Sequence, residues 1–261
     1  MPALKIGVEL ASLRLPFKKA LHMAAEWGVD AVEIDARGEI RPQQLSRTGL
    51  RQLRKTLDDF RLRVSAVGFR TRRGYDTPAD LEPRIAGTKA AMELAYQLGA
   101  SVVVNHVGRV PTDEGCDAWR LLVEVLDELG RHGHRVGALL AAETGTESGE
   151  DLARLLAALP ERAIAVDLNP ANLLVNGFSP REAVDVLGPA ILHVHATDAF
   201  RELATGRGAR APLGEGAADY AALLGALDQH GYRGYFTVAH PSADDPIQAA
   251  ADAIGYLRRL Y

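Results

Sequence analysis

Residues 191–216 read ILHVHATDAFRELATGRGARAPLGEG. The stretch opens as a short apolar run in which His193 and His195 alternate with apolar residues, as they would on one face of a strand, and it then reaches Asp198. The segment that follows is basic and carries Arg201, Arg207 and Arg210. A hydrophobic strand that ends in imidazole and carboxylate groups and continues into a polar loop is typical of the way a parallel barrel builds a site.

The same succession of an apolar run and a helical pattern recurs along all 261 residues. Strands are expected at residues 4–10, 30–34, 62–67, 101–105, 136–142, 164–166, 191–195 and 235–238. Helices are expected at residues 16–27, 42–60, 80–98, 115–132, 148–159, from 179 onward, 217–230 and 244–260. Alternating strands and helices pair in parallel with right-handed crossovers. Eight units in about 250 residues predict a single (β/α)8 TIM barrel that spans residues 1–261.

The competing architecture is a doubly wound open sheet. That fold would place a glycine-rich phosphate loop after the first strand. Residues 9–15 contain no glycine, which favours the closed barrel.

Composition excludes several function classes. The formal net charge is −4, from 30 basic and 34 acidic residues, whereas a protein that binds DNA or RNA non-specifically normally has a basic surplus. Cys116 is the one cysteine, so no intrachain disulfide can form, which fits a cytoplasmic location. No apolar run approaches the roughly 20 residues that cross a bilayer. We therefore expect a small-molecule partner and neither nucleic acid nor membrane, and the sequence is compatible with a homo-oligomer.

Polar side chains follow several of the predicted strands. In a barrel the carboxyl ends of the strands face the active site. The side chains at or near those ends are Glu33, His106, Glu143, Asp167, His195 and His240. Oxygen and nitrogen donors of this mix suit a divalent metal ion such as Mn, Mg, Co or Zn.

Five segments carry a resemblance to a known family. They are VEI at 32–34, AAETG at 141–145, VDLNPAN at 166–172, HVHATD at 193–198 and PLGEGAADYAALLGALDQHGYRGYFTV at 212–238. The chain resembles the xylose-isomerase-like TIM barrels, which include sugar and sugar-phosphate isomerases and epimerases, inosose dehydratases and endonuclease IV. The resemblance implies a metal held by Glu143, Asp167 and His195, with His193 in a supporting position. The fourth ligand, a Glu in the epimerase branch, falls at Ala239, and His240 is the adjacent donor.

The remaining polar residues also have expected roles, and Arg201 matches a position where the family places a substrate-binding arginine. Glu143 is expected as the base, and His240 as either its partner acid or a metal ligand. The expected substrate-binding residues are Glu33, His106, Asn169, Arg201, Arg207 and Arg210. The His that usually follows the sixth-strand Asp is absent, because Asp167 is followed by Leu168, Asn169 and Pro170.

The first hypothesis is therefore a metal-dependent isomerase or epimerase of a small sugar, keto-sugar or sugar phosphate. It would abstract a proton to give a metal-stabilised enediolate. A single-base lyase or dehydratase acting on a keto-sugar is the alternative that the missing glutamate favours. A catalytically silent barrel that binds a sugar or a partner is another. Phosphodiester cleavage, as in endonuclease IV, would need more His and Glu ligands than this chain has at matching places.

Overall fold

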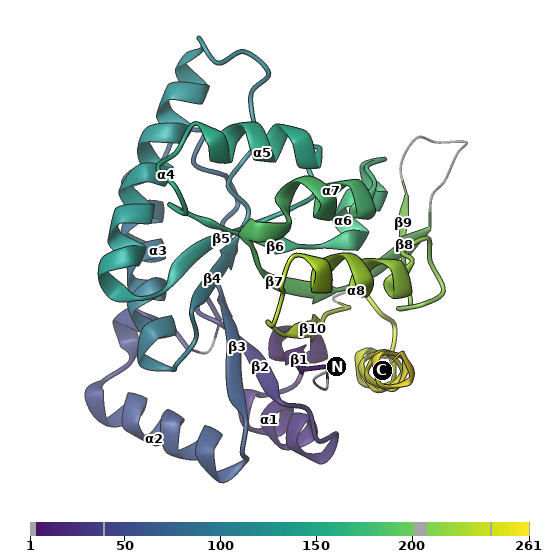
Figure 1. The fold of residues 1–261 in the computed structure, drawn as a ribbon. Coiled ribbons are helices and arrows are strands. Elements are labelled where there is room, and N and C mark those ends of the chain that lie inside the picture. The colour runs from purple at the N-terminus through teal and green to yellow at the C-terminus, as the bar shows by residue number, and fades with distance from the viewer. Residues whose placement is uncertain (1–3, 39, 201–207, 241, 261) are drawn as a thin grey trace.

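Eight short apolar strands close into one parallel barrel in the computed structural model, which describes residues 4–38, 40–200, 208–240 and 242–260. The order around the barrel is β1-β10-β7-β6-β5-β4-β3-β2 (Figure 1). The strands are β1 Ile6–Glu9, β2 Ala31–Asp35, β3 Arg63–Gly68, β4 Val102–Asn105, β5 Leu139–Glu143, β6 Ala165–Leu168, β7 Ile191–Ala196 and β10 Phe236–Val238. The predicted (β/α)8 TIM barrel is confirmed.

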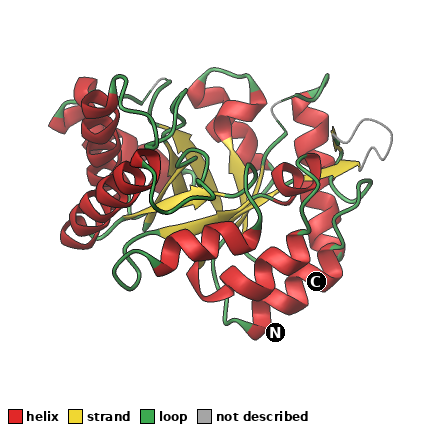
Figure 2. Ribbon diagram, turned by 90° about the horizontal axis from the view of Figure 1, so that it is seen from above, coloured by secondary structure: helices red, strands yellow, loops and turns green. Residues whose placement is uncertain are grey.

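A ring of helices covers the barrel, as the view from above shows (Figure 2). Its members are α1 Phe17–Glu26, α2 Arg47–Asp59, α3 Leu81–Gln97, α4 Asp117–Val136, α5 Gly149–Ala157, α7 Pro180–Leu187, α8 Tyr220–Gln229 and α9 Pro246–Arg259. Several begin where the side chain of a Ser or Asp accepts a hydrogen bond from a backbone N–H two or three residues on, as Ser148 does from Asp151. Among the helices of the described ranges, none is long and apolar enough to cross a membrane.

Some elements differ from the sequence-based expectation. The single helix expected over 42–60 is divided into a 3-10 turn, Pro42–Gln44, and α2, because Leu45 is extended and Ser46 caps a new helix. The strand expected from residue 136 starts at Leu139, because α4 runs to Val136 and Gly137 ends it in the left-handed region, at φ +93°.

Two elements were not expected at all. A short helix, α6 Pro170–Val175, follows β6 directly. An antiparallel hairpin of β8 Asp198–Phe200 and β9 Ala209–Ala211 lies beside α6 (Figure 1). Both lie at the carboxyl end of the barrel strands and border the candidate site.

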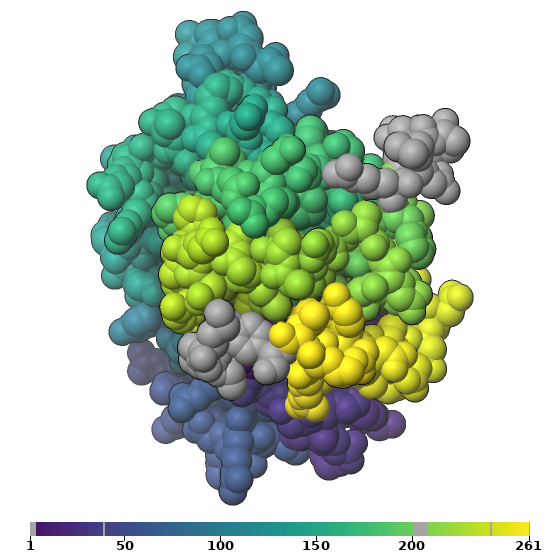
Figure 3. Space-filling model, turned by 45° about the vertical axis from the view of Figure 1, so that its right-hand side comes forward, coloured from purple at the N-terminus to yellow at the C-terminus, as the bar shows by residue number. Residues whose placement is uncertain are grey.

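Pairing of the first and last strands closes the barrel. Gly7 of β1 pairs with Thr237 of β10, which brings the two ends of the chain together. The C-terminal helix α9 lies against the N-terminal part of the chain (Figure 3), where Arg258 donates hydrogen bonds to the carbonyl oxygens of Trp27 and Gly28. The closed ring puts residues from distant strands around one mouth.

The barrel interior is partly polar. His193 of β7 shares a hydrogen bond of 2.8 Å with Oγ1 of Thr237, whose hydroxyl donates to Oγ of Ser65 on β3 at 3.1 Å. A Cβ atom on Gly7 would lie 2.8 Å from Oγ1 of Thr237, so glycine is needed here for close approach. These buried groups form the floor beneath the mouth.

Candidate active site

Glu143, Asp167 and His195 converge at the carboxyl end of three consecutive strands, β5, β6 and β7. The strand register places Glu143 directly beside Asp167. Each of the three residues offers one ligand atom, and those atoms lie within 4.8 Å of one another. Asp167 and His195 are fully buried, while the side chain of Glu143 is 10% exposed. The three side chains that the family resemblance implied as metal ligands therefore lie together.

Two carboxylates hold the imidazole of His195. Its Nδ1 lies 2.6 Å from Oδ2 of Asp167, and its Nε2 lies 2.9 Å from Oε2 of Glu33. Burial alone would lower the pKa of His195, but the charges of Asp167 and Glu33 outweigh it and raise that pKa well above its ordinary value. Burial likewise opposes ionisation of Glu33, yet His195 and a nearby guanidinium lower its pKa to about 2. Glu33 was predicted to contact substrate, and in the structure its carboxylate contacts the imidazole of His195.

His193 lies one layer deeper than His195. Its Nδ1 is 2.8 Å from Oδ1 of Asp167, and its Nε2 bonds Thr237 inside the barrel. Both oxygens of Asp167 therefore meet an imidazole. Together with Glu33 and His195, His193 also makes a second group of three possible donors.

Arg70 lies among these side chains at the mouth, and neither it nor its partner Glu9 was predicted from the sequence as a site residue. The guanidinium forms a short contact with Oε1 of Glu9 and lies 3.8 Å from Oε1 of Glu33. Its Nε lies 3.5 Å from Oε2 of Glu143, and its Nη2 lies 3.3 Å from Nε2 of His195. Burial would lower the pKa of Arg70, but Glu9, Glu143 and Glu33 raise it. The signal for Glu9 was its place at the end of the first apolar run, where Glu33 ends the second.

The loop that carries Arg70 is fixed by the end of β4. Asn105 accepts a hydrogen bond from the backbone N–H of Thr71 at 3.1 Å. The ring of His106 lies 2.5 Å from the carbonyl oxygen of Thr71, at Nε2. His106 was predicted to contact substrate, and in the structure it supports the backbone next to Arg70.

Two asparagines orient Glu143. Asn169 caps α6 and donates from Nδ2 to Oε1 of Glu143 at 2.8 Å, and Asn172 reaches the same oxygen at 3.4 Å. Arg210 of β9 donates to Oδ1 of Asn172 at 2.5 Å. Burial lowers the pKa of Arg210, although Glu143 acts against that effect. Asn169 and Arg210, both predicted as substrate-binding, thus lie beside the candidate base.

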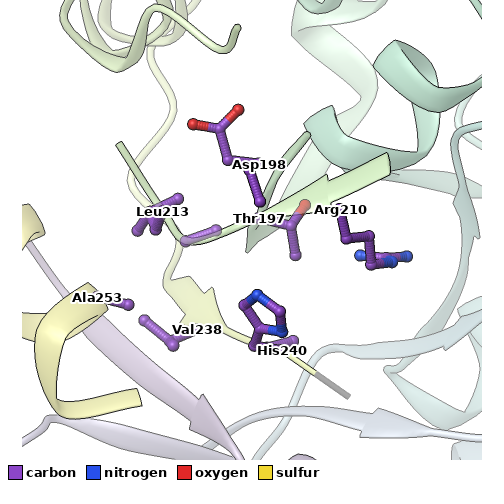
Figure 4. Close-up of a pocket in the computed structure, with 10 residues that line it drawn as sticks. Thr197, Asp198, Arg210, Leu213, Val238, His240 and Ala253 are labelled. Atoms are coloured by element: carbon purple, nitrogen blue, oxygen red, sulfur yellow. The ribbon is translucent and has the colours of Figure 1, made fainter. Parts of the chain in front are cut away.

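His240 follows the end of β10, two residues after Val238. It lines a small cavity with Thr197 and Arg210 (Figure 4), and its buried Nδ1 has no hydrogen-bond partner among the described residues. Within the same residues, neither group of three donors includes it. Ala239, at the position of the usual fourth ligand, is buried. Arg201 and Arg207 lie outside the described residues.

Asp198 has a structural part in this region. Its two buried carboxylate oxygens accept hydrogen bonds from the backbone N–H groups of residues 199, 214, 216 and 218. A Cβ atom on Gly216 would lie 2.2 Å from Oδ1 of Asp198. The carboxylate at the end of HVHATD therefore fastens the PLGEG loop to the barrel, which explains why these two motifs occur together.

The site offers an incomplete but suitable set of metal ligands. One carboxylate from each of Glu143 and Asp167 and one imidazole nitrogen of His195 match the ligands that Mn, Mg, Co or Zn accept. Among the described residues, the carboxylates of Glu9, Glu33 and Glu143 also lie within 4 Å of the guanidinium of Arg70.

Comparison with solved structures agrees with this architecture. A xylose isomerase domain protein from Planctomyces limnophilus is 24% identical and superposes with a TM-score of 0.88, covering 99% of this chain and 98% of its own. A xylose isomerase-like TIM barrel protein from Mycobacterium smegmatis, solved in complex with magnesium, is 20% identical, with a TM-score of 0.80 and coverage of 99% and 96%. At these identities the likeness shows the fold.

Sequence comparison identifies the family. An inosose dehydratase from Clostridium beijerinckii is 22% identical over 239 residues, covering 79% of each chain. The family model described as xylose isomerase-like TIM barrel matches residues 21–260, nearly the whole chain. This protein belongs to the xylose isomerase-like TIM barrel family.

Proposed function

We propose that this protein is an enzyme that removes a proton from the carbon beside the carbonyl of a small polyhydroxy compound, and that it dehydrates a keto-sugar. The observation that carries the proposal is the single oriented carboxylate, Glu143, while buried Ala239 lies where the family resemblance implies a second glutamate. A dehydration needs one base, whereas a symmetric epimerisation needs a second group on the other face of the substrate.

Glu143 meets the requirements of a general base. It ends β5 at the mouth, it is the most exposed of the three converging ligands, and two asparagines fix one of its oxygens. Its other oxygen, Oε2, lies 3.5 Å from Nε of Arg70.

A divalent metal would be held by Glu143, Asp167 and His195, and when bound it would polarise the carbonyl and an adjacent hydroxyl of the substrate. The proton balance of the reaction depends on the protein. Glu143 takes the proton from the carbon beside the carbonyl, the bond from the next carbon to its hydroxyl breaks, and the protonated Glu143 returns the proton to the departing oxygen. Water and an unsaturated carbonyl product result, and no second carboxylate is needed.

Isomerisation or epimerisation of a small sugar or sugar phosphate is the second candidate, because it begins with the same proton abstraction. His240 favours it, since this imidazole follows Ala239 directly and its buried Nδ1 has no partner among the described residues. It would supply the second proton-transfer group. The similarity to an inosose dehydratase supports the first candidate.

The two candidates differ in their products. The purified protein would be incubated in D2O with Mn2+ and with an inosose, a ketohexose and a ketose phosphate in turn, and each reaction would be followed by NMR and by absorbance. Dehydration predicts loss of one water and a conjugated product. Isomerisation or epimerisation predicts a product of unchanged mass with deuterium at the carbon beside the carbonyl. Absence of both product formation and exchange would favour a binding barrel.

A further inference from the structure

Arg70 occupies a position that a metal ion would also use. Its Nε lies 3.5 Å from Glu143 and its Nη2 lies 3.3 Å from Nε2 of His195, so the guanidinium spans two of the three expected ligands. The guanidinium also contacts Glu9, at the end of β1, and Glu33 of β2. Carboxylates from three strands therefore already share a positive charge.

We propose that Arg70 is a built-in cation of this mouth and that it competes with a divalent metal ion for Glu143 and His195. The inference concerns metal affinity and does not depend on which reaction the enzyme catalyses.

Bond lengths make the competition direct. A divalent ion lies about 2.0–2.2 Å from carboxylate oxygen and imidazole nitrogen ligands. An ion bound to Glu143 and His195 would therefore share both side chains with a guanidinium that now lies within 3.5 Å of each. Like charges this close repel strongly where water is largely excluded, and Glu33, Asp167 and His195 are buried here.

Both nitrogens of His195 already have partners. Its Nδ1 lies 2.6 Å from Oδ2 of Asp167, and its Nε2 lies 2.9 Å from Oε2 of Glu33. A metal ion bound at Nε2, the nitrogen that Arg70 approaches, would also take the place of the contact with Glu33.

The side chain of Arg70 is nevertheless free to leave the site. Its backbone is held through the bonds that Thr71 makes to Asn105 and His106, but 41% of its side chain is exposed. The guanidinium can therefore swing toward solvent while its loop stays in place. We expect two states, one with Arg70 between Glu143 and His195, the other with the metal there and Arg70 displaced.

The first test measures binding of Mn2+ alone by isothermal titration calorimetry. Arg70→Gln shortens the side chain, keeps a hydrogen-bonding group and removes the charge, and it should bind Mn2+ at least tenfold more tightly than the wild type. Arg73→Gln is the matched control, because Arg73 lies in the same loop and pairs with Asp80, outside the carboxylate cluster. Its Mn2+ affinity should equal that of the wild type. Unchanged or weaker Mn2+ binding by folded Arg70→Gln would overturn the proposal.

A second measurement uses the wild type, since Arg70→Gln leaves Glu9 and Glu33 without their cation and its fold must be checked by circular dichroism. The Nε–H resonance of Arg70, assigned with Arg70→Lys, would be followed by NMR during a Zn2+ titration. Displacement predicts that this resonance shifts or broadens in step with Zn2+ occupancy, whereas that of Arg73 stays in place. An Arg70 resonance that is unmoved at full Zn2+ occupancy would refute the competition. Neither measurement uses turnover, so their failure is distinct from failure of the proposed reaction.

Discussion

At the scale of single residues, the contacts around Glu143 determine which of its two carboxylate oxygens faces the mouth. Asn169 and Asn172 donate to Oε1, which leaves Oε2 to face Arg70 and the mouth. A base that is held in this way has its proton-accepting oxygen in place before substrate arrives, which is the arrangement that makes proton transfer efficient. The adjacent strand supplies Asp167, which is fully buried between two imidazoles and so is unsuited to the same task.

Replacing Glu143 with Gln should remove activity and spare the fold. The amide has nearly the same shape but cannot accept the proton, so we expect turnover to fall by about a thousandfold or more. Steady-state kinetics on the substrate identified by NMR provides the measurement, with Glu150→Gln on exposed α5 as the control. A Glu143→Gln protein with normal melting and more than a tenth of wild-type turnover would show that another group is the base.

Glu147 gives a prediction about stability and pH. Its side chain is buried and accepts hydrogen bonds from Thr146 and from the backbone of Gly145, yet burial raises its pKa from 4.5 to about 7. A carboxyl group whose pKa is raised on folding stabilises the protein below pH 4.5, and that contribution is lost as the pH rises through 7. Glu147→Gln should therefore be more stable than the wild type at pH 8, by up to about 3 kcal/mol, and the difference should vanish near pH 4.5.

The measurement for Glu147 is urea unfolding at pH 4.5, 6 and 8. Glu150→Gln, at an exposed position of the same helix region, should show no comparable trend. A difference between Glu147→Gln and wild type that stays constant with pH would contradict the assignment.

At the scale of elements, one buried carboxylate fastens the loop before α8. Asp198→Asn would turn one acceptor oxygen into an NH2 group that faces backbone N–H donors, so unsatisfied groups would be buried. We expect a loss of about 2–4 kcal/mol in the free energy of unfolding, measured with urea. Asp219→Asn is the matched control, because exposed Asp219 caps α8 and asparagine caps a helix equally well. Equal stability of the two variants would rule out the fastening role.

The barrel strands and the covering helices were predictable because each is an apolar run or an amphipathic pattern complete within its own segment. The hairpin of β8 and β9 was not, because its three-residue strands are mostly small or polar and pair only with each other. The short helix α6 was not predicted because Asn169 caps it directly after β6, so no loop separates the strand from the helix.

Glu143, Asp167 and His195 were predictable as a group because each ends an apolar strand. Arg70 was not, because it stands in a polar loop among Arg72 and Arg73 with nothing local to distinguish it. Only the closed barrel brings it to Glu9, 61 positions earlier in the chain. Residues that come into contact only when the barrel closes produce no periodic pattern in the sequence.

At the scale of the whole molecule, the hydrogen bonds that cross the barrel interior link strands from both halves of the chain. Thr237 of β10, the last barrel strand, bonds His193 of β7 and, 172 positions away, Ser65 of β3. His193 lies on the strand that pairs with β10, whereas Ser65 lies on β3, which does not pair with β10; because β10 also pairs with β1, the closed ring brings Thr237 to Ser65. These bonds tie the polar floor of the site to the closure of the barrel.

Thr237→Val tests that connection, because it keeps the shape of the side chain and removes its hydroxyl. His193 and Ser65 would lose a buried partner, and we expect the free energy of unfolding to fall by about 2–4 kcal/mol. Urea unfolding followed by tryptophan fluorescence and by far-UV circular dichroism should still give coincident transitions, since a closed ring opens as one unit. Thr48→Val on exposed α2 is the control and should change stability by less than about 0.5 kcal/mol. A loss no larger than that of the control would mean that the interior bonds do not stabilise closure, and separated transitions would mean that the two halves of the barrel unfold independently.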